Sequence, residues 1–202
     1  MSFWENTRKP VGLGGKLMVS LMNLGHSPVA WWGLRFLNVA PDAKVLDCGC
    51  GGGANIKRLL KKCPQGIVKG IDYSPVSVEK SQKVNADAIA KGRCTVLQGS
   101  VAKRIFAEGW FDAVTAFETV YFWPELPQCF HEIHRMLKPG GMFLICNESS
   151  GDTHKDEKWT KIIDGMTIYK DVELKAELEQ AGFCDVQIHK NKWGWLCVTA
   201  RK

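Results

Sequence analysis

A carboxylate and a run of glycines follow the first strongly apolar stretch of this sequence. Residues 45–54 read VLDCGCGGGA, so Asp47 ends the apolar part and glycines follow it at once. Because glycine has no Cβ, Gly49 and Gly51 let the backbone approach a ligand closely. A second acid, Asp72, ends the next apolar run, where a carboxylate can accept hydrogen bonds from ribose hydroxyls. The two motifs predict a nucleoside ligand, but Gly49, Gly51 and Ala54 also satisfy the dinucleotide fingerprint G-x-G-x-x-G/A.

The position of Asp47 favours a cationic ligand over a dinucleotide. It precedes the glycines, where a carboxylate would repel a pyrophosphate but would attract an ammonium or a sulfonium. Two further features narrow the choice. The sequence LKPGG at 137–141 leads into another apolar run, and the last two strand-like runs are joined by residues 191–194 only. A connection that short predicts an antiparallel hairpin.

Taken together, these segments resemble the class I S-adenosylmethionine-dependent methyltransferases, closest to the small-molecule group that resembles the ubiquinone and menaquinone biosynthesis enzymes. The resemblance covers about residues 43–148 with specific motifs and 171–200 with looser ones. It is carried by VLDCGCGGG at 45–53, GIDYS at 70–74, GSV at 99–101, FDAV at 111–114, LKPGG at 137–141 and AGF at 181–183. It implies a Rossmann-like fold, S-adenosylmethionine as cofactor and S-adenosylhomocysteine as product.

The same resemblance implies which residues hold the cofactor. The loop after the first strand would hold the methionine part, Asp72 the ribose hydroxyls and Tyr73 the adenine, while Phe117 would face the cofactor through its backbone. Many members carry Asp where this chain has Ser100, and a serine accepts a weaker hydrogen bond than a carboxylate. The cofactor-binding residues expected in this way are Asp47, Gly49, Cys50, Gly51, Asp72, Tyr73, Gly99, Ser100, Val101 and Phe117.

The acceptor is expected beside residues 117–124, FETVYFWP, which end the fourth expected strand. A parallel sheet of this kind places its reaction crevice at the carboxyl ends of its strands. Glu118 and Tyr121 are expected to face the acceptor, because a carboxylate and a phenol there need polar partners. Trp123 is expected beside them, or else in ordinary packing, and Trp31 from the N-terminal segment would face them. The segment lacks the Asn/Asp-Pro-Pro-aromatic run of amino-methylating DNA enzymes, which counts against base methylation.

The sequence leaves open whether the enzyme uses a dedicated catalytic base, and it predicts no metal site. Direct methyl displacement mainly requires alignment and exclusion of water, so a base is optional. His131 and His134 are interpreted as surface or packing residues, whereas His26 is either a helix cap or a pocket residue. The pair Cys48 and Cys50 lacks the second pair that a zinc site needs.

Elements that can position these residues begin at residue 43. Short apolar runs alternate there with amphipathic stretches, which predicts an α/β fold with a mostly parallel, seven-stranded sheet that ends in an antiparallel hairpin. The expected strands are 43–48, 66–72, 94–98, 111–117, 142–147, 183–189 and 195–200. The expected helices are 54–62, 75–91, 125–137 and 171–181.

Residues 1–40 are expected to form a short helical cap on the main domain, residues 41–202. Leu17, Leu21 and Leu24 share one helical face, and Ser27 and Pro28 are typical of the start of a second helix. Such a cap would close the open side of the pocket and exclude water.

Composition limits the class of protein and its partners. A chain of 202 residues with 45% hydrophobic and 24% charged residues fits one globular domain. Its net charge of +6 is scattered, which does not favour nucleic acid. Single cysteines in apolar runs, and the lack of a signal or membrane segment, predict a cytoplasmic protein. A monomer or a homodimer is expected. We expect a small-molecule acceptor; methylation of RNA or protein, nicotinamide binding and a non-catalytic module remain alternatives.

Overall fold

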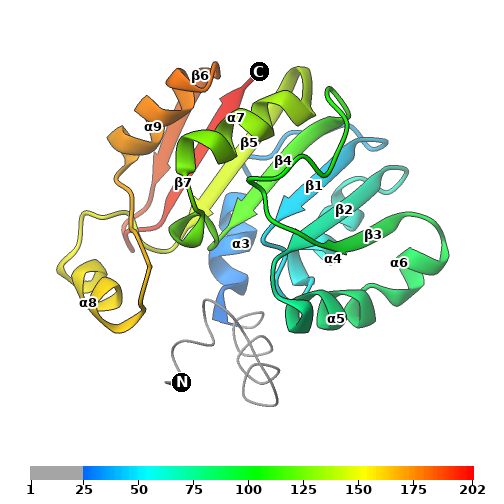
Figure 1. The fold of residues 1–202 in the computed structure, drawn as a ribbon, viewed down its shortest axis with the longest axis horizontal. Helices are drawn as coiled ribbons and strands as arrows, with labels where there is room; N and C mark the ends of the chain where they lie inside the picture. Colours follow the sequence, from blue (N-terminus) through cyan, green and yellow to red (C-terminus); the bar gives the residue numbers. More distant parts are fainter. Residues whose placement is uncertain (1–24) are drawn as a thin grey trace.

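The computed structural model describes residues 25–202, which form a seven-stranded sheet with helices on both faces (Figure 1). The sheet order is β3-β2-β1-β4-β5-β7-β6. All neighbours pair in parallel except β7, which is antiparallel to both β5 and β6. The predicted fold class, including the terminal hairpin, is confirmed. The strands are β1 Lys44–Cys48, β2 Ile67–Asp72, β3 Cys94–Gln98, β4 Phe111–Phe117, β5 Leu137–Asn147, β6 Cys184–Lys190 and β7 Leu196–Arg201.

The helices divide between the two faces of the sheet and bury two apolar clusters (Figure 1). Phe130 and Leu174 represent the cluster under α7 and α9, while Ala30 and Ile56 represent the one under α3 and α4. Burial of these apolar side chains is the main favourable contribution to folding. The helices are α3 Ser27–Gly33, α4 Ala54–Lys62, α5 Pro75–Val84, α6 Ala86–Ala90, α7 Leu126–Met136, α8 His154–Ile162 and α9 Asp171–Gln180, with a 3-10 turn η1 Val120–Phe122.

The central strands bring the predicted motifs to one edge of the sheet. Val45 and Leu46 of β1 are both fully buried because helices cover both faces. β1 runs parallel to β2 and to β4, so Cys48, Asp72 and Phe117 end at the same edge. The loops that follow these three strands therefore meet there.

β5 begins at Leu137 instead of residue 142, so it includes the LKPGG segment that was expected as a turn. Two helical segments also differ from the sequence prediction. The expected helix 75–91 is broken into α5 and α6 at Asn85, whose side-chain amide donates to the carbonyls of Gly53 and Ser81, at 3.0 and 2.9 Å. Residues 154–162, expected as polar loop, form α8, which begins with a capping box between Thr153 and Asp156. In both places, side chains that bond the backbone decide where the helix ends or begins.

The N-terminal prediction is tested only in part. The expected helix containing Leu17, Leu21 and Leu24 lies outside the described residues. The helix expected at Ser27 is α3, but its N-cap position is His26, whose side chain makes no capping hydrogen bond. Buried Val29 and Ala30 join α3 to the core under α4. No helix of the described part is long and apolar enough to cross a membrane.

Candidate functional site

The glycine loop between β1 and α4 is tied to the end of β2. The N–H groups of Gly49 and Cys50 both donate to the carbonyl of Ile71, at 2.8 and 3.0 Å. Gly51 has a φ of +50°, a backbone angle that residues other than glycine seldom adopt. A Cβ added at this position would meet no atom within 4 Å. The loop therefore presents bare backbone to open space.

Asp72, at the end of β2, faces the same space. Its Oδ2 accepts from the Gly51 N–H and its Oδ1 from the Ser74 N–H, each at 2.9 Å. Burial raises the pKa of this carboxyl, while the two backbone donors act in the opposite direction. The backbone donors fix the carboxylate but leave it lone pairs for a ligand's hydroxyl groups.

Asp47 lies deeper, at the end of β1, and is 1% exposed. Its Oδ1 accepts from the Thr115 hydroxyl at 2.8 Å, whereas its Oδ2 has no hydrogen-bond partner among the described residues. Burial raises the pKa of Asp47 to about 7, against the lowering effect of the Thr115 hydrogen bond. A buried carboxylate with a free oxygen is costly unless a cation approaches it.

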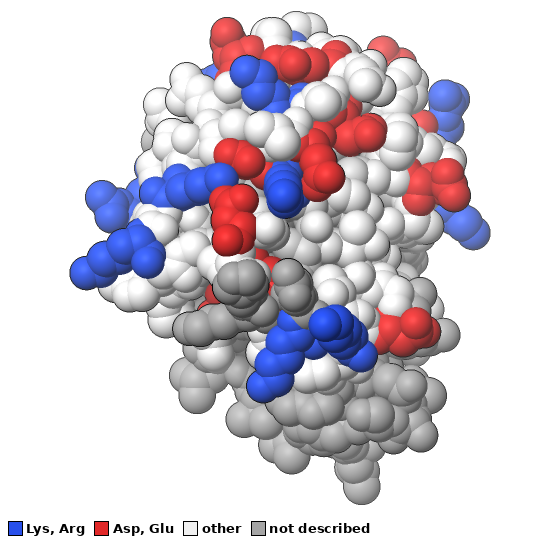
Figure 2. Space-filling view, turned by 90° about the vertical axis from the view of Figure 1, so that its left-hand side faces the viewer, with Lys and Arg blue, Asp and Glu red and all other residues white. Residues whose placement is uncertain are grey.

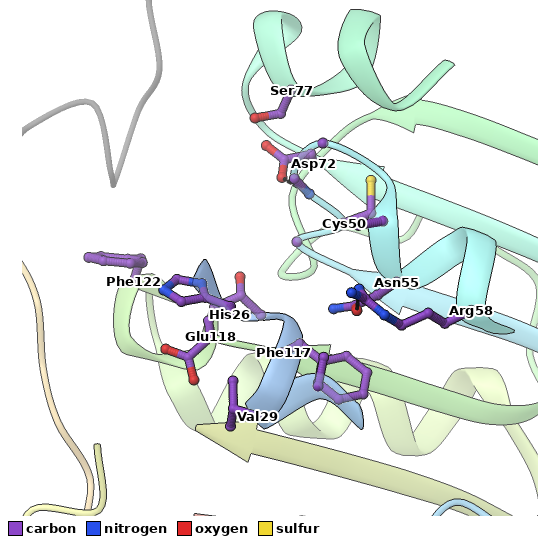
Figure 3. A pocket seen from close by; sticks show the side chains of 16 residues that line it. His26, Val29, Cys50, Asn55, Arg58, Asp72, Ser77, Phe117, Glu118 and Phe122 are labelled. Carbon is purple, nitrogen blue, oxygen red and sulfur yellow. Dashed lines mark hydrogen bonds between the residues drawn. The ribbon is translucent and has the colours of Figure 1, made fainter. Parts of the chain in front are cut away.

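A cavity open to solvent, with about 730 Å³ of empty space, connects these features to the end of β4. Figure 3 shows Asp72 and Ser77 on one side, and His26, Glu118 and Phe122 on the other. The lining residues are His26, Val29, Ala30, Gly49, Cys50, Gly51, Gly52, Ala54, Asn55, Arg58, Asp72, Ser77, Phe117, Glu118, Thr119 and Phe122.

The structure brings together about half of the residues expected to hold the cofactor. The residues of that set that line the cavity are Gly49, Cys50, Gly51, Asp72 and Phe117. Asp47 lies behind the wall. Tyr73, Gly99, Ser100 and Val101 do not line this cavity; Tyr73 is 39% exposed, whereas Val101 is buried. The residues expected to contact the adenine thus lie outside the cavity that the described residues enclose.

Of the four expected acceptor-pocket residues, only Glu118 lines the cavity, which corrects the predicted arrangement. Tyr121 is 3% exposed, and its hydroxyl accepts from the Ser149 N–H at 2.9 Å. The Trp123 indole is stacked on Phe143 with ring centroids 6.3 Å apart. Tyr121 of η1 is therefore part of the core, and Trp123, which follows η1, packs against the core while partly buried. Trp31 is 55% exposed and lies over the Arg58 guanidinium.

Glu118 has an unusual backbone. Its φ is +56°, a value that residues other than glycine seldom adopt, and its N–H donates to the carbonyl of Cys146 at 3.0 Å. Its carboxylate accepts a hydrogen bond from the N–H of Glu148, the residue that follows β5. Burial, and then the nearby charge of Glu148, raise the pKa of Glu118 to about 8. Strained residues of this kind occur often at functional sites.

Several lining residues were not predicted from the sequence. His26, which the sequence left undecided, lines the cavity, as does Arg58 of α4, whose guanidinium donates to Asn55 at 2.7 Å. No short motif marks Arg58 or Asn55, because only the direction of α4 relative to the loop brings them to the wall. His134, expected to be a packing residue, lies edge-on to Phe183 with ring centroids 5.1 Å apart.

Comparison with known proteins gives a consistent set of similarities. Residues 46–145 match a family model described as a methyltransferase domain. The chain is 32% identical over 159 residues to the cycloartenol-C-24-methyltransferase of Arabidopsis thaliana, covering 73% of this chain and 46% of that protein. It is 30% identical over 178 residues to an uncharacterized methyltransferase of Synechocystis, covering 82% of this chain and 78% of that protein.

The solved structures agree with the fold. A SAM dependent methyltransferase from Aquifex aeolicus superimposes with a TM-score of 0.76 at 18% identity, over 92% of this chain and 97% of that one. At that identity the likeness concerns the fold alone. The chain spans less than half of the length of the plant sterol methyltransferases that it matches.

Proposed function

This chain belongs to the class I S-adenosylmethionine-dependent methyltransferases, and on that basis we propose that it transfers a methyl group from S-adenosylmethionine to a small-molecule acceptor. The observation that carries the proposal is the cavity that joins the glycine loop and Asp72 to an apolar and acidic wall after β4. One end of this cavity has the groups a nucleoside cofactor needs. The other end remains for the acceptor.

The residues present fit the cofactor. When bound, S-adenosylmethionine supplies a methyl group on a positively charged sulfur, and it also carries an ammonium group and a ribose. Asp47 has a buried oxygen without a partner among the described residues, and an ammonium would supply the missing countercharge. Asp72 at the wall has acceptor capacity for ribose hydroxyls, and Gly51 leaves room for the ligand.

We propose the following assignment. Asp47 and the glycine loop hold the methionine part, Asp72 holds the ribose, and the segment after β3 lies toward the adenine with Tyr73. The residues assigned to the cofactor are Asp47, Gly49, Cys50, Gly51, Asp72, Tyr73, Gly99, Ser100, Val101 and Phe117.

The acceptor is proposed to lie between the cofactor and the wall formed by Val29, Phe117, Glu118 and Phe122. The three apolar side chains exclude water, which a direct displacement requires. His26, at the N-cap of α3, and Val29, within α3, both line the cavity. Their position supports the proposal that residues 1–40 act as a cap on the pocket. The relatives named for sterol methylation act on small molecules by their names, and this supports an acceptor of that size.

A nucleic-acid substrate would instead require a continuous basic surface. On the face shown in Figure 2, Lys and Arg alternate with Asp and Glu. Among the ion pairs of the described residues, Lys190 pairs with Asp152 at 2.6 Å and with Asp171 at 2.8 Å.

The eight cysteines are all free, and seven of them are buried, which supports the expectation of a reducing compartment such as the cytoplasm.

The test is an incubation of the protein with S-adenosylmethionine carrying a deuterated methyl group and a whole-cell extract, which is afterwards separated into metabolite, RNA and protein fractions. We expect one class of small molecules to gain the label, with S-adenosylhomocysteine formed in equal amount. The matched control is Asp72→Asn, which should reduce both signals. Label found only in the RNA or protein fraction would refute the small-molecule acceptor, and no S-adenosylhomocysteine with any fraction would refute the activity.

A further inference from the structure

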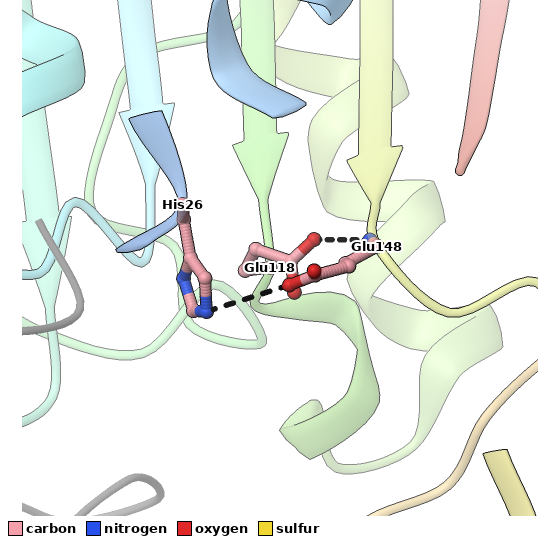
Figure 4. Close-up of side chains that lie close together, drawn as sticks. All are labelled: His26, Glu118 and Glu148. Atoms are coloured by element: carbon pink, nitrogen blue, oxygen red, sulfur yellow. Dashed lines mark hydrogen bonds and ion pairs between the residues drawn. The ribbon is translucent and has the colours of Figure 1, made fainter. Parts of the chain in front are cut away.

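Three ionisable side chains from distant segments meet at the acceptor end of the cavity. His26 precedes α3, Glu118 follows β4 and Glu148 follows β5, and their side-chain nitrogen and oxygen atoms lie within 4.8 Å of one another (Figure 4). The Glu118 carboxylate accepts from the Glu148 N–H. His26 Nε2 lies 3.9 Å from Glu148 Oε2, a separation that a bridging water can span.

The cluster leads from the cavity toward solvent. His26 and Glu118 line the cavity. The side chains of His26 and Glu148 are 34% and 53% exposed, so both also reach water. Among the side chains that the structure describes, neither carboxylate forms an ion pair with a lysine or an arginine. Arg58, on the same wall, donates instead to Asn55 and Ser27. The two carboxylates therefore lie close together, and among the described side chains the basic group beside them is the imidazole of His26.

This arrangement favours protons on the carboxylates. Burial, and then the charge of Glu148, raise the pKa of Glu118 to about 8, and burial also raises the pKa of Glu148. Burial lowers the pKa of His26, so its imidazole is neutral near pH 7 and can accept or donate a proton. Two further groups face Glu118, namely Tyr121 of η1 and Cys146 of β5, and the pKa of each is raised well above its ordinary value. Neither of them carries charge near neutral pH.

We propose that Glu118 is the catalytic base of the methyl transfer, that Glu148 and His26 pass its proton to solvent, and that the acceptor is a molecule with a nucleophilic O–H or N–H group. This inference rests on the function proposed above. The lone pair of the acceptor's oxygen or nitrogen forms a bond to the methyl carbon while the carbon–sulfur bond breaks, and that electron pair remains on sulfur. The acceptor's proton goes to the Glu118 carboxylate. The positive charge of the sulfonium and the negative charge of the carboxylate are both lost, so charge and atoms balance.

The location suits that role. Glu118 directly follows Phe117, whose aromatic ring lies beside Val29 on the apolar wall (Figure 3). A general base works best when its pKa is near the working pH, because it is then ionised often enough and still basic enough to take a proton. The hydrogen bond from Glu148 and the left-handed backbone hold the Glu118 carboxyl in place.

The first experiment measures protonation directly, without an acceptor. Nuclear magnetic resonance of protein with isotope-labelled glutamate, saturated with S-adenosylhomocysteine, should show one carboxyl that titrates near pH 8 and disappears in Glu118→Gln. In Glu148→Gln the same signal should titrate at lower pH, because the neighbouring negative charge is gone. A spectrum in which every glutamate titrates near its ordinary pKa would overturn the proposal.

The second experiment uses the labelled-methyl assay with the whole-cell extract. Glu118→Gln should lower turnover by about a hundredfold or more, with the affinity for S-adenosylhomocysteine nearly unchanged. Turnover of the unaltered protein should rise with pH up to about 8, and Glu148→Gln should shift that rise to lower pH. The matched control is Glu179→Gln on the outer face of α9, near Lys175, which should leave both properties as they are.

The outcomes separate this inference from the proposed function. Failure to bind S-adenosylhomocysteine would remove the proposed function itself. Binding together with full turnover of Glu118→Gln would overturn only the base. Saturable binding of MnCl₂ that is lost in Glu118→Gln would also overturn it, because the cluster would then be a cation site.

Discussion

Replacement of Asp47 by asparagine should stabilise the cofactor-free protein at neutral and alkaline pH and weaken cofactor binding at the same time. Asp47 is 1% exposed, and its Oδ2 lacks a partner among the described residues. Asparagine has the same shape and can still accept from the Thr115 hydroxyl, but it carries no charge. The substitution therefore measures how much the negative charge of a buried carboxylate lowers the free energy of unfolding.

The magnitude follows from the pKa. The unfolded chain releases the Asp47 proton near 3.8 and the folded chain near 7, so the folded state holds the extra proton between these values. A raised carboxyl pKa means that stability is lost as pH rises through this window, by up to about 4 kcal/mol. The asparagine variant lacks this loss. Its free energy of unfolding, relative to the unaltered protein, should increase by up to that amount from pH 4 to 8.

The assay is urea unfolding of both proteins at a series of pH values. Asp112→Asn is the matched control with opposite sign, because the Lys138 hydrogen bond and the Lys44 N–H lower the pKa of Asp112 despite its burial. That variant should lose stability near neutral pH, and the loss should disappear only as the pH falls below the ordinary pKa of an aspartate and through the lower pKa that Asp112 has in the folded protein. Calorimetry should show that Asp47→Asn binds S-adenosylhomocysteine about 1 to 3 kcal/mol more weakly, since a charge-assisted contact is lost. Stability differences independent of pH, or unchanged affinity, would refute the reasoning.

Three further predictions concern single side chains. Asp72→Asn should weaken S-adenosylhomocysteine binding by about 1 to 3 kcal/mol without unfolding the domain, and calorimetry that shows unchanged affinity would exclude the ribose role. Gly51→Val should reduce that affinity more severely, because φ is +50° and a branched side chain would enter the cavity; near-normal binding would mean that the loop is misplaced. Tyr121→Phe should cost about 1 to 3 kcal/mol of unfolding free energy, since the Ser149 N–H loses its buried acceptor, and urea denaturation with an unchanged midpoint would contradict that bond.

The sheet was predictable because its information is local. β3 and β4 have the predicted bounds, 94–98 and 111–117, since each is a short apolar run between charged or glycine-rich segments. The antiparallel hairpin followed from a connection of four residues. The break at Asn85 and the start of α8 were missed, because each depends on a side chain that bonds a backbone group, and the Thr153 and Asp156 capping box was the available signal.

Only the part of the candidate site that is formed by short sequence motifs was predictable. Asp47, the glycine loop and Asp72 stand in short motifs, and each motif ends a strand, so parallel pairing brings them together. On the acceptor side, the residues that reach the cavity depend on how the chain after β4 turns in the tertiary structure, which no local motif indicates. The residues of FETVYFWP are divided between the cavity wall and the core: Glu118 lies at the cavity, Tyr121 is buried, and Trp123 is partly buried against the core. Nothing in the sequence near Glu148 indicated that it would lie beside Glu118.

The central claim is that the cavity binds S-adenosylmethionine by its cationic and ribose groups. Calorimetric titration of the purified protein with S-adenosylhomocysteine, and separately with NADH, tests it most directly. We predict saturable binding of S-adenosylhomocysteine at one site per chain, reduced in Asp72→Asn, and no measurable heat with NADH. Binding of NADH in place of S-adenosylhomocysteine, or binding of neither, would contradict the account.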